Sequence, residues 1–179
     1  LDFGASPSAS PATNTAAIQA AINTGKTVYI PTGNYQISSQ INLPTVGQTI
    51  YGDGPQRSVL IAQPGFTGNG VFATLGGTEG PILKSFKITC VQPNTSDRAS
   101  LNTYPPALYF RSTRNFHISE MQITRFQYGI DMRGTSTNIS GGSSINGLEI
   151  GCFTTAIMLG ESLDTERLIQ VHSWPYDMV

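Results

Sequence analysis

The segment Ile118-Ser119-Glu120-Met121-Gln122-Ile123 recurs further along the chain as Ile145-Asn146-Gly147-Leu148-Glu149-Ile150. The match continues at the same offset with two further aligned pairs, Phe126 with Phe153 and Ile130 with Ile157. Apolar residues recur at this spacing where each coil of a solenoid packs its inward side chains against the coil before it. The repeat therefore predicts a parallel β solenoid.

An earlier copy of the same frame carries an insertion. Leu83, Phe86 and Ile88 precede the frame that begins at Ile118 by a longer interval, and the polar stretch 92–106 accounts for the additional length. A solenoid tolerates such insertions because its turns project away from the stacked core. A β-sandwich also contains many short strands, but it does not repeat one apolar frame at this spacing. We therefore expect the solenoid.

One segment, residues 14–23, has the pattern of an amphipathic helix. Its apolar residues form a single stripe, Asn14 or Thr15 is suited to cap its first turn, and Gly25 is suited to end it. The rest of the chain reads as short strands separated by glycine, proline, asparagine and serine. The fold class expected from these patterns is all-β with one short helix.

Charged residues make up 12% of the 179-residue chain, about half of the usual share of roughly 25%. The formal net charge is −1 and the basic residues form no cluster, which argues against a nucleic-acid partner. No apolar run approaches the roughly 18–20 residues that cross a bilayer, so we expect no membrane insertion. A neutral surface rich in hydroxyl and amide groups is suited to binding sugars.

The two cysteines, Cys90 and Cys152, lack the CxxC spacing of zinc and redox sites. In the repeat they take equivalent positions two coils apart, with Arg125 between them. Stacked coils are about 4.8 Å apart, which would separate the two Cα atoms by roughly 10 Å, beyond the roughly 7 Å limit of a disulfide. We therefore expect two free thiols.

Four motifs follow one another in the first third of the chain. They are Leu1-Asp2-Phe3-Gly4-Ala5, Asn14-Thr15-Ala16-Ala17-Ile18-Gln19-Ala20-Ala21-Ile22, Gly25-Lys26-Thr27-Val28-Tyr29-Ile30-Pro31-Thr32-Gly33-Asn34-Tyr35 and Ile50-Tyr51-Gly52-Asp53-Gly54. In this order they resemble the opening of the pectate-lyase-like right-handed parallel β-helix superfamily. The family's usual acidic residue before the helix is replaced by Thr13-Asn14, which still permits a cap. The resemblance implies a right-handed single-stranded parallel β-helix whose first end is covered by a short α-helix.

This resemblance divides the chain into two parts. We expect residues 1–25 to form an entry segment with the capping helix, and residues 26–179 to form the first coils of the β-helix. A solenoid needs protection at both ends, but the segment from Leu168 to Val179 contains nothing that resembles a cap. We therefore expect the β-helix to continue beyond residue 179.

Two branches of the superfamily are similar to this chain. The bacteriophage tailspike and tail-fibre branch resembles it in the uncharged surface and in the segment His172-Ser173-Trp174-Pro175-Tyr176. That branch implies a virion protein, a homotrimer that binds bacterial surface polysaccharide and in its intact form depolymerises it as a glycosidase or a lyase. The branch of secreted pectate lyases and polygalacturonases implies an extracellular enzyme instead. A non-catalytic β-helix that serves as an adhesive rod is the third alternative.

Hydrolysis of a glycosidic bond requires two carboxyl groups, about 5 Å apart in retaining enzymes and about 6.5–9.5 Å apart in inverting ones. The outward positions of the repeat form two rows, Lys87, Gln122, Glu149 and Gln170 in one and Tyr109, Asp131 and Met158 in the next. Glu149 and Asp131 are the candidate catalytic residues of these rows, each without a second carboxylate beside it. Asp164 and Glu166, close together in a turn with Glu161, are further candidates.

Aromatic side chains are the other candidates for contact with sugar, because pyranose rings lay their apolar faces on indole and phenol rings. Trp174, Tyr176 and, in the inserted stretch, Tyr104 are the candidate carbohydrate-binding residues.

His117 and His172 have no paired serine or cysteine nucleophile motif. The lyase members of the superfamily use calcium, but the sequence has no loop rich in aspartate, so we expect no metal and no cofactor.

Overall fold

The computed structural model describes residues 3–44, 46–74, 78–94, 97–135, 140–162 and 165–175. The described residues form the α-helix α1 (Pro11–Asn23), the short 3-10 helix η1 (Arg98–Ser100) and ten strands. The strands are β1 (Val28–Ile30), β2 (Gly33–Asn42), β3 (Thr49–Gly52), β4 (Ser58–Ala73), β5 (Ile82–Lys84), β6 (Lys87–Cys90), β7 (Leu108–Tyr109), β8 (His117–Asp131), β9 (Ser144–Met158) and β10 (Arg167–Pro175). The predicted all-β class with one short α-helix is confirmed. None of the described helices is long and apolar enough to cross a membrane.

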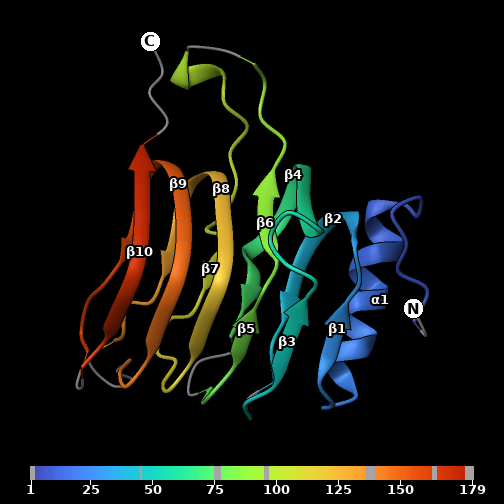
Figure 1. The fold of residues 1–179 in the computed structure, drawn as a ribbon. Helices are drawn as coiled ribbons and strands as arrows, with labels where there is room; N and C mark the ends of the chain where they lie inside the picture. Colours follow the sequence, from blue (N-terminus) through green and yellow to red (C-terminus); the bar gives the residue numbers. More distant parts are fainter. Residues whose placement is uncertain are drawn as a thin grey trace.

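All pairings between these strands are parallel, and they fall into three ladders. The first ladder joins β1, β3, β5 and the first residues of β8, β9 and β10. The second joins the first halves of β2 and β4 to β6, to the middle of β8 and β9 and to the end of β10. The third joins the ends of β2, β4, β8 and β9 through β7. Each turn of the chain through these ladders, called a pass below, therefore lies beside the one before it, from β1 beside α1 to β10 at the far end (Figure 1).

Each ladder lays a column of apolar side chains in the interior. The columns are Ile50, Leu83, Ile118 and Ile145 in the first ladder, Leu60, Ile88, Ile123 and Ile150 in the second, and Phe72, Leu108 and Ile130 in the third. All of these side chains are fully or almost fully buried. Because burying one such side chain contributes about 1.5–3 kcal/mol, the columns hold the ladders together. The inward frame that the repeat predicted is confirmed.

The chain turns from the first ladder to the second at a single residue with a left-handed backbone. In four successive passes this residue is Ser85, Glu120, Gly147 and Gln170, with φ values of 58°, 52°, 67° and 50°. Only glycine adopts this conformation without a steric penalty from its Cβ atom. The packed passes on either side must therefore hold the three other residues in it.

This corner corrects one predicted row. Gln170 lies at the corner, level with Gly147, so the prediction that it continues the outward row of Glu149 is wrong. His172 is the register partner of Glu149 instead. The corner residue belongs to neither ladder and recurs in each of these passes, so aligning Leu168 and Val171 with Ile145 and Leu148 places His172, and not Gln170, level with Glu149.

A second left-handed residue corrects the predicted alignment of the aromatic pair. Arg125, with φ of 72°, follows the second ladder in β8 and adds an extra residue to that strand. Cys152 consequently pairs with Phe126, and Phe153 does not stand over Phe126 as the repeat predicted. Further along the strand the predicted offset is restored, and Ile130 pairs with Ile157.

Helix α1 begins earlier than predicted. Its N-cap is Ser10, whose Oγ accepts a hydrogen bond from the amide of Thr13 at 3.2 Å, and Pro11 starts the first turn. A serine followed by proline is a favourable helix start, because proline fixes a helical φ and has no amide hydrogen to leave unpaired. The prediction that Asn14 or Thr15 caps the helix is therefore wrong.

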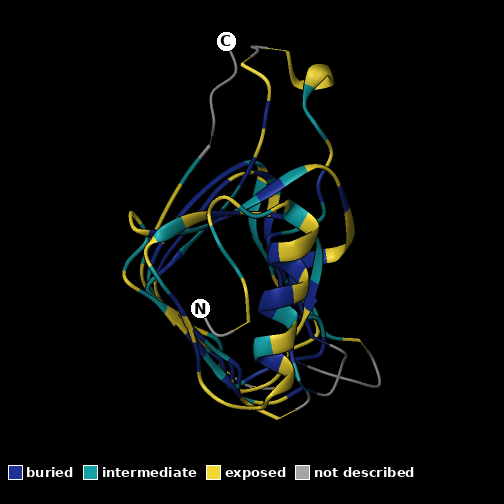
Figure 2. Cartoon of the chain, turned by 90° about the vertical axis from the view of Figure 1, so that its right-hand side faces the viewer, coloured by how far each residue is buried: buried dark blue, intermediate teal, exposed yellow. Residues whose placement is uncertain are grey.

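Asn14 and Thr15 instead attach the helix to the strands. Asn14 Nδ2 donates to the carbonyl of Gln36 at 3.1 Å, and Thr15 Oγ1 accepts from the amide of Ser38 at 3.0 Å. The helix lies across the first passes of the chain with its buried face toward the interior (Figure 2). These bonds place α1 along β2, where it covers the end of the core.

Both cysteines are buried and unbridged, so the predicted free thiols are confirmed. Cys90 Sγ donates to the carbonyl of Arg125 at 3.0 Å, whereas Cys152 pairs with Phe126, so the two are not in one register. Burial raises the pKa of each thiol to about 12. The reactive thiolate is therefore scarce at neutral pH.

We expect neither thiol to react with 5,5′-dithiobis(2-nitrobenzoic acid) in the folded protein at pH 8. After unfolding in guanidinium chloride both are expected to react, because the solvated pKa returns to about 8.5. The released thionitrobenzoate, measured by absorbance, counts the reactive thiols in each state. Rapid labelling of either cysteine without denaturant would contradict the buried placement.

Candidate functional site

The outer face of the second ladder carries a line of polar side chains. Lys87 of β6, Gln122 of β8, Glu149 of β9 and His172 of β10 are register partners in adjacent strands. Neighbouring parallel strands are about 4.8 Å apart, so the four residues follow one another directly across the sheet. We call these four residues the Glu149 row.

Hydrogen bonds connect the middle of the Glu149 row. Gln122 Nε2 donates to Glu149 Oε2 at 2.8 Å, and Gln56 Nε2 donates to Gln122 Oε1 at 3.4 Å. Burial and the nearby Arg125 guanidinium lower the pKa of Lys87, and the charge of Glu149 opposes that shift. The row thus offers donors and acceptors in alternation, which suits the hydroxyl groups of a sugar chain.

Trp174 lies beside the Glu149 row on the same outer face. It is the register partner of Gly151, and its indole packs so closely there that a Cβ atom on Gly151 would lie 2.7 Å from the indole Nε1. The imidazole of His172 has its centroid 5.3 Å from that of the indole ring system. The Trp174 side chain is partly exposed to solvent. The structure therefore brings the predicted binding residue Trp174 and the candidate acid Glu149 onto one face.

A groove of about 600 Å³ lies on the outer side of the third ladder. It is lined by Gly68, Asn69, Pro105, Pro106, Tyr109, Arg111, Tyr128, Asp131, Arg133 and Met158. Asp131 is the register partner of both Tyr109 and Met158, so the second predicted row is confirmed. The Asp131 carboxylate faces the groove, but the side chains of two arginines cover this carboxylate.

Those arginines hold both oxygens of Asp131, whose side chain is 3% exposed. Arg111 Nε donates to Oδ2 at 2.8 Å, and Arg133 donates through Nε to Oδ1 at 2.9 Å and through Nη2 to Oδ2 at 2.8 Å. Burial alone would raise the pKa of Asp131, but the hydrogen bonds from the two guanidinium groups outweigh it and the pKa is lowered. The ion pairs therefore stabilise the fold above the unfolded pKa of about 3.9, and this contribution is lost as the pH falls through the lower folded value.

This geometry does not favour Asp131 as a general acid. A general acid must carry a proton at the working pH, and a carboxylate with a lowered pKa and two charged donors does not. The residue instead positions two guanidinium groups at the groove. Arg133 was detectable from the sequence, because it follows Asp131 by two residues, a spacing that places two side chains on the same side of an extended chain.

Tyr104 lies in the core rather than on the surface. It is 3% exposed, packs edge to face against Phe126 at a centroid distance of 5.9 Å, and donates its hydroxyl to the carbonyl of Val91 at 2.8 Å. Burial raises its pKa to about 12. Because neither ring face is open to a sugar, the predicted binding role does not fit this geometry, and Tyr104 instead anchors the inserted stretch.

Among the other predicted residues, the structure describes Glu166, which belongs to neither row. Glu166 accepts a hydrogen bond from the amide of Ser143 at 3.2 Å and so ties the last passes of the chain together. Asp164 and Tyr176 lie outside the described residues. The pair Asp164 and Glu166 stays a prediction, as does the role of Tyr176.

One polar pair was missed by the sequence analysis. His117 Nδ1 lies 2.6 Å from Ser144 Oγ, and the two are register partners in the first ladder. They are separated by the same offset as the two copies of the repeat, so the signal was present in the sequence. A catalytic triad also requires an acidic group that orients the histidine. Within the described ranges no such bond to His117 occurs, and we read the pair as a cross-strand contact.

No group of three histidine, cysteine, aspartate or glutamate side chains suited to hold a metal occurs in the part of the chain that the structure describes.

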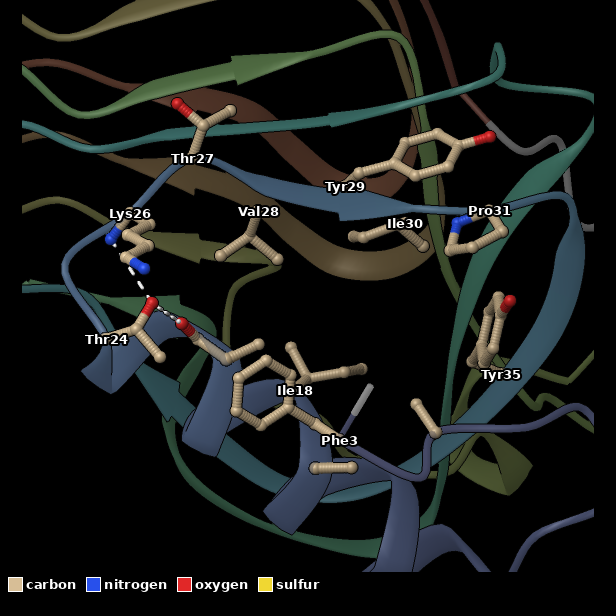
Figure 3. Close-up of a pocket in the computed structure, with 13 residues that line it drawn as sticks. Phe3, Ile18, Thr24, Lys26, Thr27, Val28, Tyr29, Ile30, Pro31 and Tyr35 are labelled. Atoms are coloured by element: carbon tan, nitrogen blue, oxygen red, sulfur yellow. Dashed lines mark hydrogen bonds between the residues drawn. The ribbon is translucent and has the colours of Figure 1, made fainter. Parts of the chain in front are cut away.

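A further cavity of about 460 Å³ lies between α1 and β1, with Ile18 and Val28 on facing walls (Figure 3). Its lining is mainly apolar, and the hydroxyl of Tyr35 has no hydrogen-bond partner among the described residues. The cavity is the end of the apolar core beneath the helix, and it lacks the convergent polar groups that would orient a sugar.

Comparison with known proteins places this arrangement among known folds. The family described as "Rhamnogalacturonase A/epimerase, pectate lyase-like" matches residues 1–154. Among curated proteins, none matches the chain significantly.

Two solved structures share the fold. The first is the pre-mature form of bacteriophage phi29 gene product 12, with a TM-score of 0.63 and 18% identity over 89% of this chain and 25% of that one. The second is the catalytic unit of a GH87 α-1,3-glucanase from Streptomyces thermodiastaticus, with a TM-score of 0.56 and 15% identity over 97% of this chain and 40% of that one. The chain thus spans a quarter of the first structure and two fifths of the second. At such identities the likeness concerns the fold alone.

The family match extends from the first residue through α1 and into β9, and so includes most of the three parallel ladders. The earlier resemblance rested on motifs in the first third of the chain, whereas this match covers more than four fifths of it. The chain belongs to the rhamnogalacturonase A/epimerase, pectate lyase-like family.

Proposed function

We propose that this chain is part of a phage tailspike-like protein that binds bacterial surface polysaccharide along the outer face of its parallel ladders. In this proposal residues 1–25 are the entry segment with the capping helix, and residues 26–179 are coils of a right-handed single-stranded parallel β-helix. The family match and the likeness in fold to a phage gene product support the proposal. The protein would assemble as a homotrimer on the virion.

The observation that carries the proposal is the shared face of Trp174 and the Glu149 row. A partly exposed indole beside amide, carboxylate and imidazole groups matches a sugar chain, which has apolar ring faces and many hydroxyls. Glu149, Gln122 and Trp174 come from three successive strands, so the face extends along the stack as a polymer does. Tyr176, two residues beyond Trp174 in the sequence, stays a candidate for contact with the sugar.

Cleavage of the polysaccharide is the finer part of the proposal. Glu149 is the candidate acid or base, because it is exposed and its carboxylate accepts a single described hydrogen bond, from Gln122. In the described rows no second carboxylate is its register partner. We therefore propose binding for this chain and cleavage for the intact protein, with the second group of the reaction outside these rows.

A secreted carbohydrate-active enzyme is the second candidate function. Its support is the likeness in fold to the catalytic unit of an α-1,3-glucanase. Release of reducing ends from α-1,3-glucan, with none from bacterial capsule or lipopolysaccharide, would favour this candidate. Sedimentation equilibrium separates the two further, because the tailspike proposal expects a trimer and the secreted enzyme a monomer.

We expect Trp174→Ala to weaken binding of the 179-residue chain to its polysaccharide by at least about tenfold. Removing a central aromatic contact typically costs about 2 kcal/mol or more, and a cost of about 1.4 kcal/mol already lowers an affinity tenfold. Biolayer interferometry against immobilised capsular polysaccharides and lipopolysaccharides would first identify a ligand and then compare the variant with the wild type.

Two further variants sharpen this measurement. Gly151→Val keeps the indole but removes the surface it packs on, and we expect a comparable loss of binding with Trp174 still present. Tyr51→Ala removes an exposed aromatic ring of the first ladder, which stacks on Tyr29 at 5.1 Å, and is expected to leave binding unchanged. Loss of binding in Tyr51→Ala and not in Trp174→Ala would move the site to the first ladder.

A further inference from the structure

We infer that Arg111 and Arg133 form a subsite for an oxyanion, a carboxylate or a phosphate group, in the groove beside the third ladder. The inference rests on the proposed function in one respect, namely that the oxyanion is carried by a bound glycan. The subsite lies on a different face from the Glu149 row, because its residues belong to the third ladder and those of the row to the second.

The charges of the groove do not cancel. Two guanidinium groups share one carboxylate, that of Asp131, at distances of 2.8 Å to 2.9 Å. Asp131 is the acidic residue among those that line the groove. One net positive charge is therefore left at the groove wall, where it attracts an anion.

Both guanidinium groups keep N–H donors that are available for an oxyanion. Arg111 uses Nε for Asp131, and Arg133 uses Nε and Nη2, so within the described residues both Nη atoms of Arg111 and Nη1 of Arg133 bind no side chain. The two side chains are 37% and 43% exposed, compared with 3% for Asp131. Guanidinium groups with free N–H donors bind carboxylate and phosphate through paired hydrogen bonds.

The two arginines are held in place before any ligand binds. Asp131 fixes both of them from below, and the guanidinium carbon of Arg111 lies 5.4 Å from the centroid of the Tyr109 ring. A cation over an aromatic face is attracted to it and loses rotational freedom. Less conformational entropy is therefore lost when the donors meet an anion.

The part of the groove lining that the inserted stretch contributes is also held in place. Pro105 and Pro106 end the inserted stretch, which is tied down by a network of amide side chains. Gln127 Nε2 and Gln92 Nε2 both donate to the carbonyl of Asn102, at 2.7 Å and 2.9 Å. Buried Tyr104 holds the same stretch from inside. The insertion that the sequence places at 92–106 thus forms one side of the groove.

The groove also offers a surface for the sugar that would carry the anion. Tyr128 lines it and is 39% exposed, so part of this aromatic side chain is accessible to a sugar. A structural ion triad alone would require neither this exposed ring nor a space of about 600 Å³ in front of it. The ligand chemistry is therefore a sugar unit that bears an oxyanion.

The first test uses small anions and needs no glycan. The Nε–H groups of Arg111 and Arg133 are hydrogen-bonded to Asp131 and should give resolved ¹⁵N–¹H signals at low temperature. We expect titration with sodium acetate or inorganic phosphate to shift both signals, and the stronger response identifies the preferred oxyanion. Absence of any shift with both anions, at constant ionic strength, would overturn the subsite.

The second test compares charged and neutral sugars. The probes are a tetramer of glucuronic acid, its carboxyl-reduced glucose counterpart and a glucose tetramer bearing phosphate monoesters, measured by isothermal titration calorimetry. We expect an acidic tetramer to bind the wild-type chain at least tenfold more tightly than the neutral one, because hydrogen bonds to charged groups are stronger than those between neutral groups.

Variants assign that preference to the arginines. Arg111→Gln and Arg133→Gln are each expected to lose about tenfold in affinity for the acidic tetramer, and Arg133→Lys to recover part of it. Arg57→Gln, which removes an exposed arginine outside the groove, is the matched control. Equal binding of charged and neutral tetramers, or unchanged affinity in both glutamine variants, would overturn the subsite and leave the proposed function intact. Anion-induced shifts without binding of any polysaccharide would instead overturn the proposed function and leave the subsite standing.

Discussion

Replacing Phe126 with alanine is expected to lower the free energy of unfolding by about 3–5 kcal/mol. Phe126 is fully buried, pairs with Cys152 across the β8–β9 ladder and supports the ring of Tyr104. Removing a buried phenylalanine loses its transfer free energy and leaves a cavity that neighbouring passes cannot fill without breaking register. The inserted stretch is expected to loosen as well, because Tyr104 loses its support.

Urea unfolding followed by far-ultraviolet circular dichroism measures this effect. Phe3→Ala is the matched control, because Phe3 is 48% exposed and the same truncation there is expected to cost less than about 1 kcal/mol. If both variants lose a similar amount, or if Phe126→Ala unfolds at the wild-type midpoint, the burial of Phe126 and the pairing of β8 with β9 are placed wrongly.

Replacing Gly129 with alanine is expected to cost about 2–3 kcal/mol, although only one methyl group is added. A Cβ atom at this position would collide with the backbone carbonyl of Ala156 and with the end of the Ile150 side chain. A backbone carbonyl in a ladder cannot move without lengthening its hydrogen bonds, so the strain is not relieved by a change of rotamer. The effect comes from the close approach of β8 and β9 at this point.

Gly160→Ala provides the comparison for this variant. A Cβ atom at Gly160 would meet the flexible side chain of Arg133 at 3.4 Å, an ordinary contact, and we expect a change within about 0.5 kcal/mol. Thermal unfolding monitored by calorimetry would rank the two variants. A Gly129→Ala protein as stable as Gly160→Ala would show that the strands are further apart here than described.

The repeat alone predicted the inward frame and most of the strand register. Positions 118, 121 and 123 align with 145, 148 and 150 in the structure as they do in the sequence. The two register errors concern Gln170, which lies at the corner of its pass and not in the outward row, and Phe153, because the left-handed Arg125 adds a residue to β8 before Phe126. A glycine indicates a position where a left-handed corner is favourable, and Gly147 occupies such a corner.

For the candidate sites, the sequence identified separate residues and the fold decided which of them meet. Glu149 and Trp174 were both predicted, but only the pairing of β9 with β10 puts them on one face. Asp131 was predicted as a lone acid, but in the structure its carboxylate accepts hydrogen bonds from two arginines and holds them in position. Tyr104, chosen for its aromatic ring, is enclosed by the core.

The amino-acid sequence by itself determined that this chain stacks apolar residues in repeated passes, carries one helix near its start, keeps its cysteines free and has a surface with little charge. Those features depend on which residues are apolar and how often they recur, and these are local properties of the chain. The tertiary structure alone decided where the corners fall, which polar side chains become neighbours and how much solvent reaches each. Those outcomes depend on the register of strands that are distant in the sequence, and a shift of one residue in that register moves a side chain from the surface to the core.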